Sequence, residues 1–175
     1  SGRTGVLYKK RAVSLSPLFG GGDQEMGFRP GTENLVEILE FTKALKVMDK
    51  IKVGESKRLR ILRDYFIKKL RNLNSDLIIN GDLKNRLPSN VNVTIPKTPS
   101  DLLVIELSAR GIMTSAKSAC KSGDGEASHV IEAIRQIDGE TSTKEIDGSL
   151  RFSLGRQTTK SDIDYTVRSL SLILI

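Results

Sequence analysis

The spacing of apolar residues along the chain predicts an alternation of strands and helices. Two short apolar runs, residues 4–10 and 13–19, lie close together and predict a pair of neighbouring strands. Apolar residues then recur every three or four positions over residues 35–51, which predicts a helix that Gly54 ends. A second apolar stripe with the same spacing predicts another helix over residues 55–72.

The second half of the chain continues this alternation, and its polar residues fall at the positions expected of caps and turns. The predicted elements are, in order, strands over 77–79 and 91–95, a helix from Ser100 to Gly111, a helix that begins near Ser128, a strand over 149–154, and a terminal helix capped by Thr159 and Asp162. In the strand over 149–154, Leu150 and Phe152 share one face with Leu154. Arg151 is therefore expected on the face opposite the core.

The composition fits one globular α/β domain, or one domain with part of another. The chain has 175 residues, of which 38% are hydrophobic and 28% charged, so it is long enough to bury a core. Its single cysteine excludes an internal disulfide framework and favours a reducing compartment. No leader peptide and no apolar run approaching about 18 residues is evident, so we expect a cytoplasmic protein without a membrane span.

The net charge of +7 raises nucleic-acid binding as an alternative function. The predicted helix over 55–72 carries much of this charge, on the positions that surround its apolar stripe. Aromatic residues are only 5% of the chain, and the basic residues are spread over several elements instead of forming one stripe. A solvated basic surface is therefore favoured, and a nucleic-acid partner is not expected.

The most unusual stretch of the chain is residues 112–128, which contain Cys120. Apart from its first two residues the stretch is small and polar with two glycines, which is typical of a loop. Lys117 and Lys121 flank the thiol, and neighbouring cations favour the nucleophilic thiolate. The alternative is an unreactive cysteine in a surface loop. Because Cys120 and His129 are the only cysteine and histidine, no metal site is predicted.

A second candidate site is the glycine-rich segment over residues 20–34, which precedes the first predicted helix. Backbone N–H groups and the positive end of the helix dipole could hold an anion there, near Thr32. The spacing matches neither the Walker nor the Rossmann pattern, and such a segment is more often only a turn. Both interpretations stay open on the residues alone.

Four segments, taken together, carry a family resemblance. They are Gly21-Gly22-Asp23-Gln24-Glu25 through Arg29-Pro30-Gly31-Thr32-Glu33-Asn34; Arg86-Leu87-Pro88-Ser89-Asn90-Val91-Asn92-Val93; Ser118-Ala119-Cys120-Lys121-Ser122-Gly123 with Ser128-His129-Val130; and Arg151-Phe152-Ser153-Leu154-Gly155-Arg156 with Thr158-Thr159. In this order and spacing they resemble the pyridoxal-phosphate-dependent cysteine desulfurases of the NifS/IscS type, within the class V aminotransferase group. The resemblance covers nearly the whole chain.

The resemblance implies a role for three residues. Cys120 would be the nucleophile that takes the substrate's sulfur as a persulfide, through which it could also hold a transient iron–sulfur cluster. Arg151 would pair with the substrate α-carboxylate, which a planar guanidinium suits. Thr32 would reach the cofactor phosphate of the other subunit in a homodimer.

The resemblance also implies a fold and a division of the chain. The fold is expected to be the C-terminal portion of the fold-type I pyridoxal-phosphate enzymes, an α/β architecture. Residues 1–31 would end the large domain with a strand hairpin, residues 32–54 would form the connecting helix, and residues 55–175 the small domain. That domain would hold an antiparallel or mixed sheet packed with helices. No lysine matches the family's Schiff-base position, so the cofactor site of this chain is expected to be incomplete.

The implied activity of the full-length protein is cysteine desulfuration, which converts L-cysteine to L-alanine and delivers sulfur for iron–sulfur clusters or other sulfur cofactors. The expected partners are L-cysteine and a sulfur-acceptor or scaffold protein, and the chain alone is expected to be inactive. Lys117 and Lys121 replace small residues common in the family and make the thiol's surroundings more cationic. The alternative is a non-catalytic interaction or dimerisation module derived from a desulfurase, suggested by the unmatched lysine.

Overall fold

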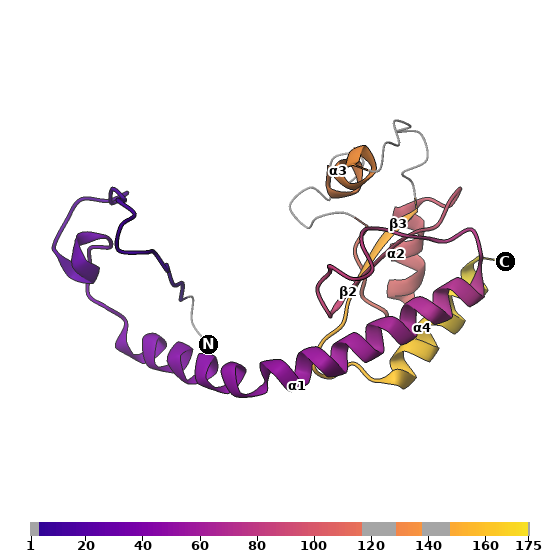
Figure 1. The fold of residues 1–175 in the computed structure, drawn as a ribbon, viewed down its shortest axis with the longest axis horizontal. Coiled ribbons are helices and arrows are strands. Elements are labelled where there is room, and N and C mark those ends of the chain that lie inside the picture. The colour runs from indigo at the N-terminus through magenta and orange to yellow at the C-terminus, as the bar shows by residue number, and fades with distance from the viewer. Residues whose placement is uncertain (1–3, 117–128, 138–147, 175) are drawn as a thin grey trace. The chain divides into compact units, whose positions relative to one another are not determined.

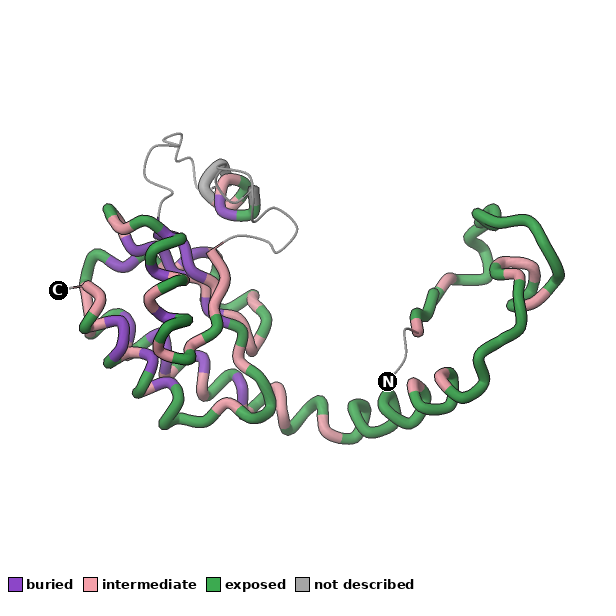
Figure 2. The backbone as a smooth tube through the Cα atoms, turned by 180° about the vertical axis from the view of Figure 1, so that it is seen from behind, coloured by how far each residue is buried: buried purple, intermediate pink, exposed green. Residues whose placement is uncertain are grey.

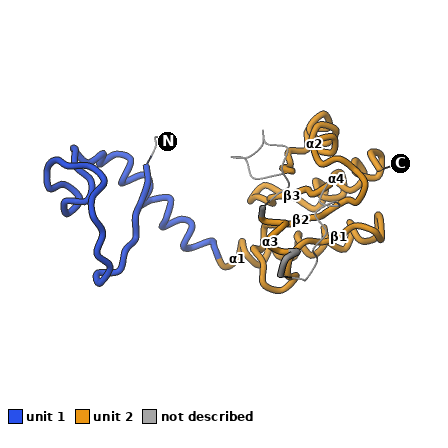
Figure 3. Tube along the Cα trace, turned by 90° about the horizontal axis from the view of Figure 1, so that it is seen from above, with its two compact units in different colours: residues 1–52 blue, residues 53–175 orange. Residues whose placement is uncertain are grey.

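The computed structural model of the 175-residue chain describes residues 4–116, 129–137 and 148–174 (Figure 1). Within the helix at 129–137, side chains are described for residues 130–134. The chain divides into two compact units, residues 1–52 and 53–175 (Figure 3). Each unit is considered by itself below. The division into residues 1–31, 32–54 and 55–175 that the sequence suggests stays a prediction.

The strand hairpin predicted in the first unit does not form among residues 4–19. These residues contain no strand, and their backbone bonding is a turn in which Val13 N–H donates to the Lys10 carbonyl at 3.0 Å. Apolar side chains such as Leu7, Leu18 and Phe19 are exposed. A lone hairpin is marginal in water because its strands need a neighbour and an apolar face to pack, and the described residues of this unit supply neither.

The two helices predicted over residues 35–51 and 55–72 are in fact one helix, α1 (Leu35–Leu73). Its start is capped by Asn34, whose side-chain oxygen accepts the Glu37 N–H at 3.3 Å. The prediction that Gly54 ends the helix is wrong. A glycine inside a helix costs only about 1 kcal/mol relative to alanine, whereas starting a new helix requires an unfavourable nucleus, so the helix continues through Gly54.

The second unit is built on a small sheet of three antiparallel strands, in the order β1 (Ile78–Ile79), β2 (Asn90–Thr94) and β3 (Ser149–Ser153). In the register between β2 and β3, Val91 lies opposite Phe152 and Val93 opposite Leu150. Three helices accompany the strands: α2 (Ser100–Ala109), α3 (His129–Ile137) and α4 (Lys160–Ile173). The predicted strands and helices of residues 77–174 are therefore present.

The core of this unit lies between one face of the sheet and helices α1, α2 and α4, where the buried positions gather (Figure 2). Phe66 on α1 meets Phe152 on β3 edge to face, with ring centroids 5.0 Å apart. Each fully buried side chain of this size stabilises the fold by about 1.5–3 kcal/mol relative to an exposed one. The core residues are Phe66, Ile67, Leu70, Leu77, Val91, Val93, Ile95, Leu103, Leu107, Leu150, Phe152, Ile163 and Leu170.

The ends of two helices show how local sequence sets the boundaries. At the end of α2, Gly111 N–H donates to the Ser108 carbonyl and Ile112 N–H to the Leu107 carbonyl, each at 2.9 Å. This Schellman arrangement needs the positive φ of 76° that Gly111 adopts. Ser100, predicted as the cap of α2, is instead its first residue, and the preceding Pro99 makes no side-chain cap bond.

The capping box predicted for the terminal helix is present. The Thr159 hydroxyl accepts the Asp162 N–H at 3.3 Å, and the Asp162 carboxylate accepts the Thr159 N–H at 2.8 Å. Ile163 and Leu170 then place the apolar stripe of α4 in the core. None of the helices in the described part of the chain has the length and apolar character required to cross a membrane.

Candidate functional site

The sheet of the second unit has one apolar and one polar face. In β2, Val91 and Val93 are fully buried against the core, while Asn90 and Asn92 alternate with them onto the other face. In β3 the buried Leu150 and Phe152 likewise alternate with Arg151. Asn92 lies opposite Arg151 in the antiparallel register. The strand alternation therefore places Arg151 away from the core, as predicted.

A buried hydrogen-bond network fixes part of this polar face. Asn80, which follows β1, donates from Nδ2 to Asn92 Oδ1 at 2.6 Å and to Thr94 Oγ1 at 2.9 Å. Its backbone N–H donates to the Asn92 carbonyl at 3.0 Å, which continues the strand pairing beyond β1. Ser149 Oγ also donates to Asn92 Oδ1, at 3.3 Å. Buried polar groups that are mutually satisfied in this way hold the strand ends in one arrangement.

A cavity of about 440 Å³ lies over the polar face. Its walls come from the loop between β1 and β2, from β2 and β3, and from α3, which contributes apolar side chains. Pockets of this size with an apolar wall and a few convergent polar groups are typical of small-molecule sites. The lining residues are Asn80, Gly81, Asp82, Asn85, Arg86, Asn90, Asn92, Ala116, Val130, Ile131, Ile134 and Arg151.

Arg151 lines this cavity from β3 with a half-buried side chain. Its backbone is paired on both sides: Asn92 lies opposite it on β2, and Ser115 forms an antiparallel bridge with it on the other side. The Arg151 N–H donates to the Ser115 carbonyl at 2.7 Å, and Thr114 Oγ1 donates to the Arg151 carbonyl at 2.8 Å. Its guanidinium contacts no acceptor among the described residues, so it is available to an anion in the cavity.

A second arginine, Arg86, lines the same cavity and was given no role by sequence reasoning. Its Nη2 donates to the carbonyl oxygen of Asn80, whereas its Nε and Nη1 are buried and have no hydrogen-bond acceptor among the described residues. Burial lowers the pKa of Arg86 from its usual value, and the nearby Arg63 lowers this pKa further. Its position in the loop, two residues before Pro88, gave no signal of burial, because the burial depends on how this loop folds.

Asp82 is the acidic residue of the cavity wall, and its carboxylate is bound to its own loop. One oxygen accepts the Lys84 N–H at 2.6 Å, and the other accepts from the Asn85 side chain at 2.8 Å. These bonds, the Lys84 N–H first among them, hold the pKa of Asp82 below its ordinary value. Asp82 is therefore ionised near neutral pH, but its oxygens make no ion pair with Arg86.

Thr32 belongs to the first unit, where it lies exposed two residues before the N-cap of α1. The segment before it turns sharply: Glu25 and Met26 have φ values of 51° and 57°, and Gly31 has a φ of 100°. Gln24 fastens this turn by accepting the Gly31 N–H at 3.2 Å. An exposed hydroxyl close to the positive end of a long helix suits a phosphate oxygen.

Cys120, the central residue of the sequence interpretation, lies outside the described residues, as do Lys117 and Lys121. His129 is the first residue of α3, in the first turn as predicted, and its side chain is likewise outside them. The structure does place the residues that lead into this segment. Thr114 and Ser115 contact Arg151, and Ala116 lines the cavity.

Comparison with known proteins identifies the family. The sequence profile described as aminotransferase class V matches residues 3–166. The chain belongs to the class V aminotransferase family. This membership confirms the resemblance carried by the four sequence segments, and it implies pyridoxal 5′-phosphate as the cofactor.

Among the relatives of this class V aminotransferase chain are proteins named as cysteine desulfurases. It is 38% identical over 174 residues to the cysteine desulfurase IscS of Dictyoglomus turgidum. The matched region covers 97% of this chain and 42% of that protein. It is 36% identical over 160 residues to cysteine desulfurase IscS 1 of Archaeoglobus fulgidus, and this match covers 91% of the chain and 40% of that protein. The chain thus spans about two fifths of the length of these relatives.

Solved structures confirm the fold class. A structure described as a NifS-like protein matches 95% of the chain and 41% of its own, with a TM-score of 0.78 and 27% identity. A NifS-like protein from Rickettsia africae matches 93% of the chain and 41% of its own, with a TM-score of 0.74 and 25% identity. The small antiparallel sheet and its helices therefore have the architecture of these proteins.

The residues of the chain fit the implied cofactor in part. Thr32 offers a hydroxyl beside a helix N-terminus, which suits the phosphate group, and Arg151 offers a guanidinium in a polar cavity, which suits the carboxylate of an amino acid. Neither Lys9 nor Lys10 matches the family's Schiff-base lysine. Lys9 donates instead to the Val13 carbonyl at 3.0 Å and lies over the Phe28 ring.

Proposed function

We propose that this chain is the C-terminal part of a pyridoxal-phosphate-dependent cysteine desulfurase, which moves sulfur from L-cysteine to Cys120. The observation that carries the proposal is the position of Arg151. It lies in a polar cavity, and Ser115, which forms a β-bridge with it, leads directly into the segment that contains Cys120. The relatives named as cysteine desulfurases support the same activity.

Arg151 binds the α-carboxylate of the substrate. A guanidinium forms two parallel charge-assisted hydrogen bonds with a carboxylate, and the cavity lowers the competition from water. Its backbone is bonded to the neighbouring chain segments on both sides, which fixes the position of the Cα atom from which the side chain extends. The carboxylate is thereby held at a defined place, and the β-carbon and sulfur of L-cysteine extend from it.

Cys120 is the acceptor of the sulfur. Its thiolate attacks the sulfur of L-cysteine, the carbon–sulfur bond breaks, and the electron pair of that bond passes to the substrate carbon, which takes up a proton. The products are L-alanine and a persulfide on Cys120, so the substrate carbon is reduced while the sulfur pair is oxidised. Lys117 and Lys121 favour the attacking thiolate by their positive charge.

Chain length is consistent with this transfer. Cys120 follows Ser115 by five residues, so their Cα atoms are at most about 18 Å apart. Ser115 itself is bonded to the backbone of Arg151. The segment is therefore anchored next to the carboxylate site at one end and is long enough to carry the sulfur away from it to an acceptor protein.

Thr32 would help to hold the phosphate of the cofactor in the other subunit of a homodimer. The chemistry that pyridoxal phosphate supplies when bound is an electron sink for the α-carbon of the substrate. In this arrangement the chain contributes the carboxylate site, the sulfur acceptor and one phosphate contact. Residues 1–31 would end the large domain, residues 32–54 would form the connecting helix, and residues 55–175 would form the small domain. Because no lysine of the chain matches the family's Schiff-base position, the chain alone would be inactive.

The persulfide sulfur passes to an acceptor or scaffold protein for the synthesis of iron–sulfur clusters or another sulfur cofactor. We place this reaction in the cytoplasm. The test is sulfur delivery from L-cysteine by the full-length protein with Cys120→Ser, with Ser118→Ala in the same segment as the control. The rate should fall about a hundredfold or more in Cys120→Ser alone. A parental rate would show that Cys120 is not the acceptor.

A second candidate is a non-catalytic interaction or dimerisation module, favoured by the surface of the first unit. None of the described residues of this unit is buried (Figure 2). Its exposed side chains include Leu18, Phe19 and Leu35. Apolar surface of this kind is typical of an interface. A full-length protein that dimerises but produces no alanine from L-cysteine would favour this candidate over the desulfurase.

A further inference from the structure

The cavity over the polar face of the sheet contains two arginines, and the proposed desulfurase reaction uses only one. We propose that Arg86 is a second contact for the substrate carboxylate, which is bound between the guanidinium groups of Arg86 and Arg151. This inference rests on the proposed function in that the bound carboxylate is taken to be that of an amino acid. The hydrogen bonding of Arg86 itself indicates an anion at this side chain.

The guanidinium of Arg86 is incompletely satisfied. It has five N–H donors in a fixed plane, and the bond it makes is from Nη2 to the Asn80 carbonyl. Nε and Nη1 are buried and have no acceptor in the part of the chain that the structure describes. A buried donor without a partner is costly, and the cost is larger for a charged group. Arg86 itself lines the cavity, so a small rotation of its side chain would bring these donors to an anion bound there.

The charges around Arg86 also favour an added anion. Arg63 on α1 is only 4% exposed and contributes a second positive charge nearby, which disfavours the charged form of Arg86. Arg63 is itself paired with Asp64, at 2.7 Å. Asp82 also lines the cavity, and its negative charge favours the charged form of Arg86, but it is the single acidic residue among the described lining residues and faces two arginines, Arg86 and Arg151. The described residues thus leave the cavity with an excess of positive charge.

Arg86 and Arg151 line the same cavity, the first from the loop between β1 and β2 and the second from β3. The Asn80 N–H donates to the Asn92 carbonyl, and Asn92 lies opposite Arg151, so these three residues form one row over the three strands. Adjacent strands are separated by about 4.8 Å, so the backbones of Asn80 and Arg151 are roughly 10 Å apart. Arg86 Nη2 contacts the Asn80 carbonyl at one end of this row. A carboxylate in the cavity can therefore lie between the two side chains.

The test measures carboxylate binding directly on the chain, without cofactor or turnover. The side-chain Nε–H signals of Arg86 and Arg151 are followed by nuclear magnetic resonance during titrations with acetate, L-alanine and L-alaninamide. Acetate carries only the carboxylate, and L-alaninamide lacks it. We expect the two signals to shift along one binding curve with acetate and L-alanine, and to stay unchanged with L-alaninamide.

Substitutions give the second measurement. Arg86→Lys and Arg151→Lys should each weaken acetate binding by about tenfold to a hundredfold, because each removes charge-assisted hydrogen bonds. Arg60→Lys, at an exposed position of α1, should leave the affinity unchanged. If Arg86→Lys does not fold, the shift of the Arg86 signal in the unsubstituted chain still shows whether Arg86 contacts the bound carboxylate.

Three results would overturn the inference: a shift of the Arg151 signal alone, an unchanged acetate affinity in folded Arg86→Lys, or no acetate binding by either arginine. These outcomes are independent of sulfur delivery by Cys120. Loss of the proposed function would appear in that separate assay and would leave acetate binding as it is.

Discussion

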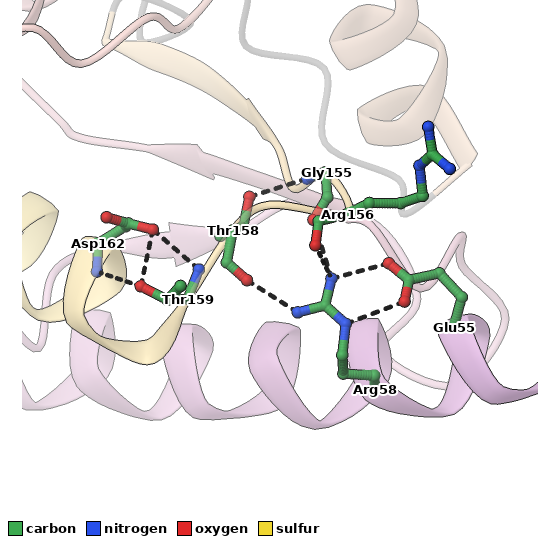
Figure 4. A network of polar contacts seen from close by, with 7 residues as sticks. All are labelled: Glu55, Arg58, Gly155, Arg156, Thr158, Thr159 and Asp162. Carbon is green, nitrogen blue, oxygen red and sulfur yellow. Dashed lines mark hydrogen bonds and ion pairs between the residues drawn. The ribbon is translucent and has the colours of Figure 1, made fainter.

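Arg58 on α1 donates a hydrogen bond from Nη1 to the carbonyl oxygen of Thr158 at 2.8 Å, although the two residues are 100 positions apart in the sequence (Figure 4). Nη2 of the same guanidinium donates to the Gly155 and Arg156 carbonyls, at 3.0 Å each. Glu55, one turn earlier on α1, accepts from Nε and Nη2. The loop that follows β3 is therefore fixed to α1 by one side chain.

We expect Arg58→Ala to lower the Tm by several degrees, because three carbonyls lose their donor and Glu55 loses its partner. Arg60→Ala is the control, since Arg60 is the same residue type at an exposed position of the same helix. Both are measured by thermal unfolding followed by circular dichroism. Equal Tm values for the two variants would show that the Arg58 contacts contribute nothing to the stability of the loop.

Gly148, the residue before β3, is expected to tolerate no side chain. Its φ is 92°, and a Cβ atom built there would lie 1.8 Å from the Ile95 carbonyl oxygen. The Gly148 carbonyl also accepts the Ile95 N–H at 3.0 Å, so the two backbones cannot separate without breaking this bond. Gly148→Ala should therefore lower the free energy of unfolding by more than about 3 kcal/mol.

The matched variant is Gly155→Ala, where nothing lies within 4 Å of the added Cβ. Its stability should stay close to that of the parent. Both free energies of unfolding come from urea titration followed by circular dichroism. A small effect at Gly148 would mean that the strand approach at Ile95 is wider than the structure has it.

Gly54 should behave in the opposite way. It lies inside α1, and a Cβ added there meets no atom within 4 Å. Alanine is favoured over glycine in a helix interior by roughly 0.5–1 kcal/mol, so Gly54→Ala should raise helix content and stability by about that amount. If residue 54 is instead a break between two helices, the substitution will leave the far-ultraviolet circular dichroism and the urea midpoint unchanged.

Acid stability should depend on Asp164, which accepts the Tyr65 hydroxyl at 2.6 Å and pairs with Lys69 at 2.9 Å. These contacts, the Tyr65 bond first, lower the pKa of Asp164 below that of the unfolded chain. Because the pKa is lowered, the carboxylate contributes its full stabilisation when the pH is above the pKa of the unfolded chain, about 3.9. This contribution is lost as the pH falls from there through the pKa of the folded chain.

Tyr65→Phe should therefore raise the pKa of Asp164 and reduce the loss of stability between about pH 4 and the folded pKa. The control is Tyr165→Phe, because the Tyr165 hydroxyl donates to the Arg110 carbonyl and not to a carboxylate. Carboxyl carbon resonances give the pKa, and urea titrations at several pH values give the stability. The same Asp164 titration in both variants would exclude the Tyr65 bond as a cause.

Local pattern was sufficient for the elements that build the candidate site. Strict alternation in β2 and β3 predicted that Arg151 faces away from Leu150 and Phe152, and the structure has it there. The capping box of Thr159 and Asp162 could also be predicted, because both partners are close in the sequence. Short-range signals of this kind need no tertiary information.

The predictions that were wrong concern structures that depend on distant contacts or on the continuity of a helix. Gly54 was taken as a stop because glycine is a weak helix former, yet a single such residue costs less than the end of α1 would. The strands expected within residues 4–19 had no partner among the described residues of their unit.

The burial of Arg86 could not be predicted from the sequence for a related reason. Its burial and its unsatisfied donors depend on how the loop after β1 folds back towards Asn80, which no local pattern encodes. The roles of Cys120, Arg151 and Thr32 came from the family resemblance and stay predictions.

The central claim is that Cys120 receives the sulfur of L-cysteine while Arg151 holds the carboxylate. The most direct measurement is the mass of the Cys120 peptide after the full-length protein, loaded with pyridoxal phosphate, has reacted with L-cysteine without an acceptor. The account predicts that this peptide gains one sulfur atom, that reductant removes it, and that Arg151→Lys lowers its yield at a given L-cysteine concentration. An unmodified Cys120 peptide in protein that still converts L-cysteine to L-alanine would contradict it.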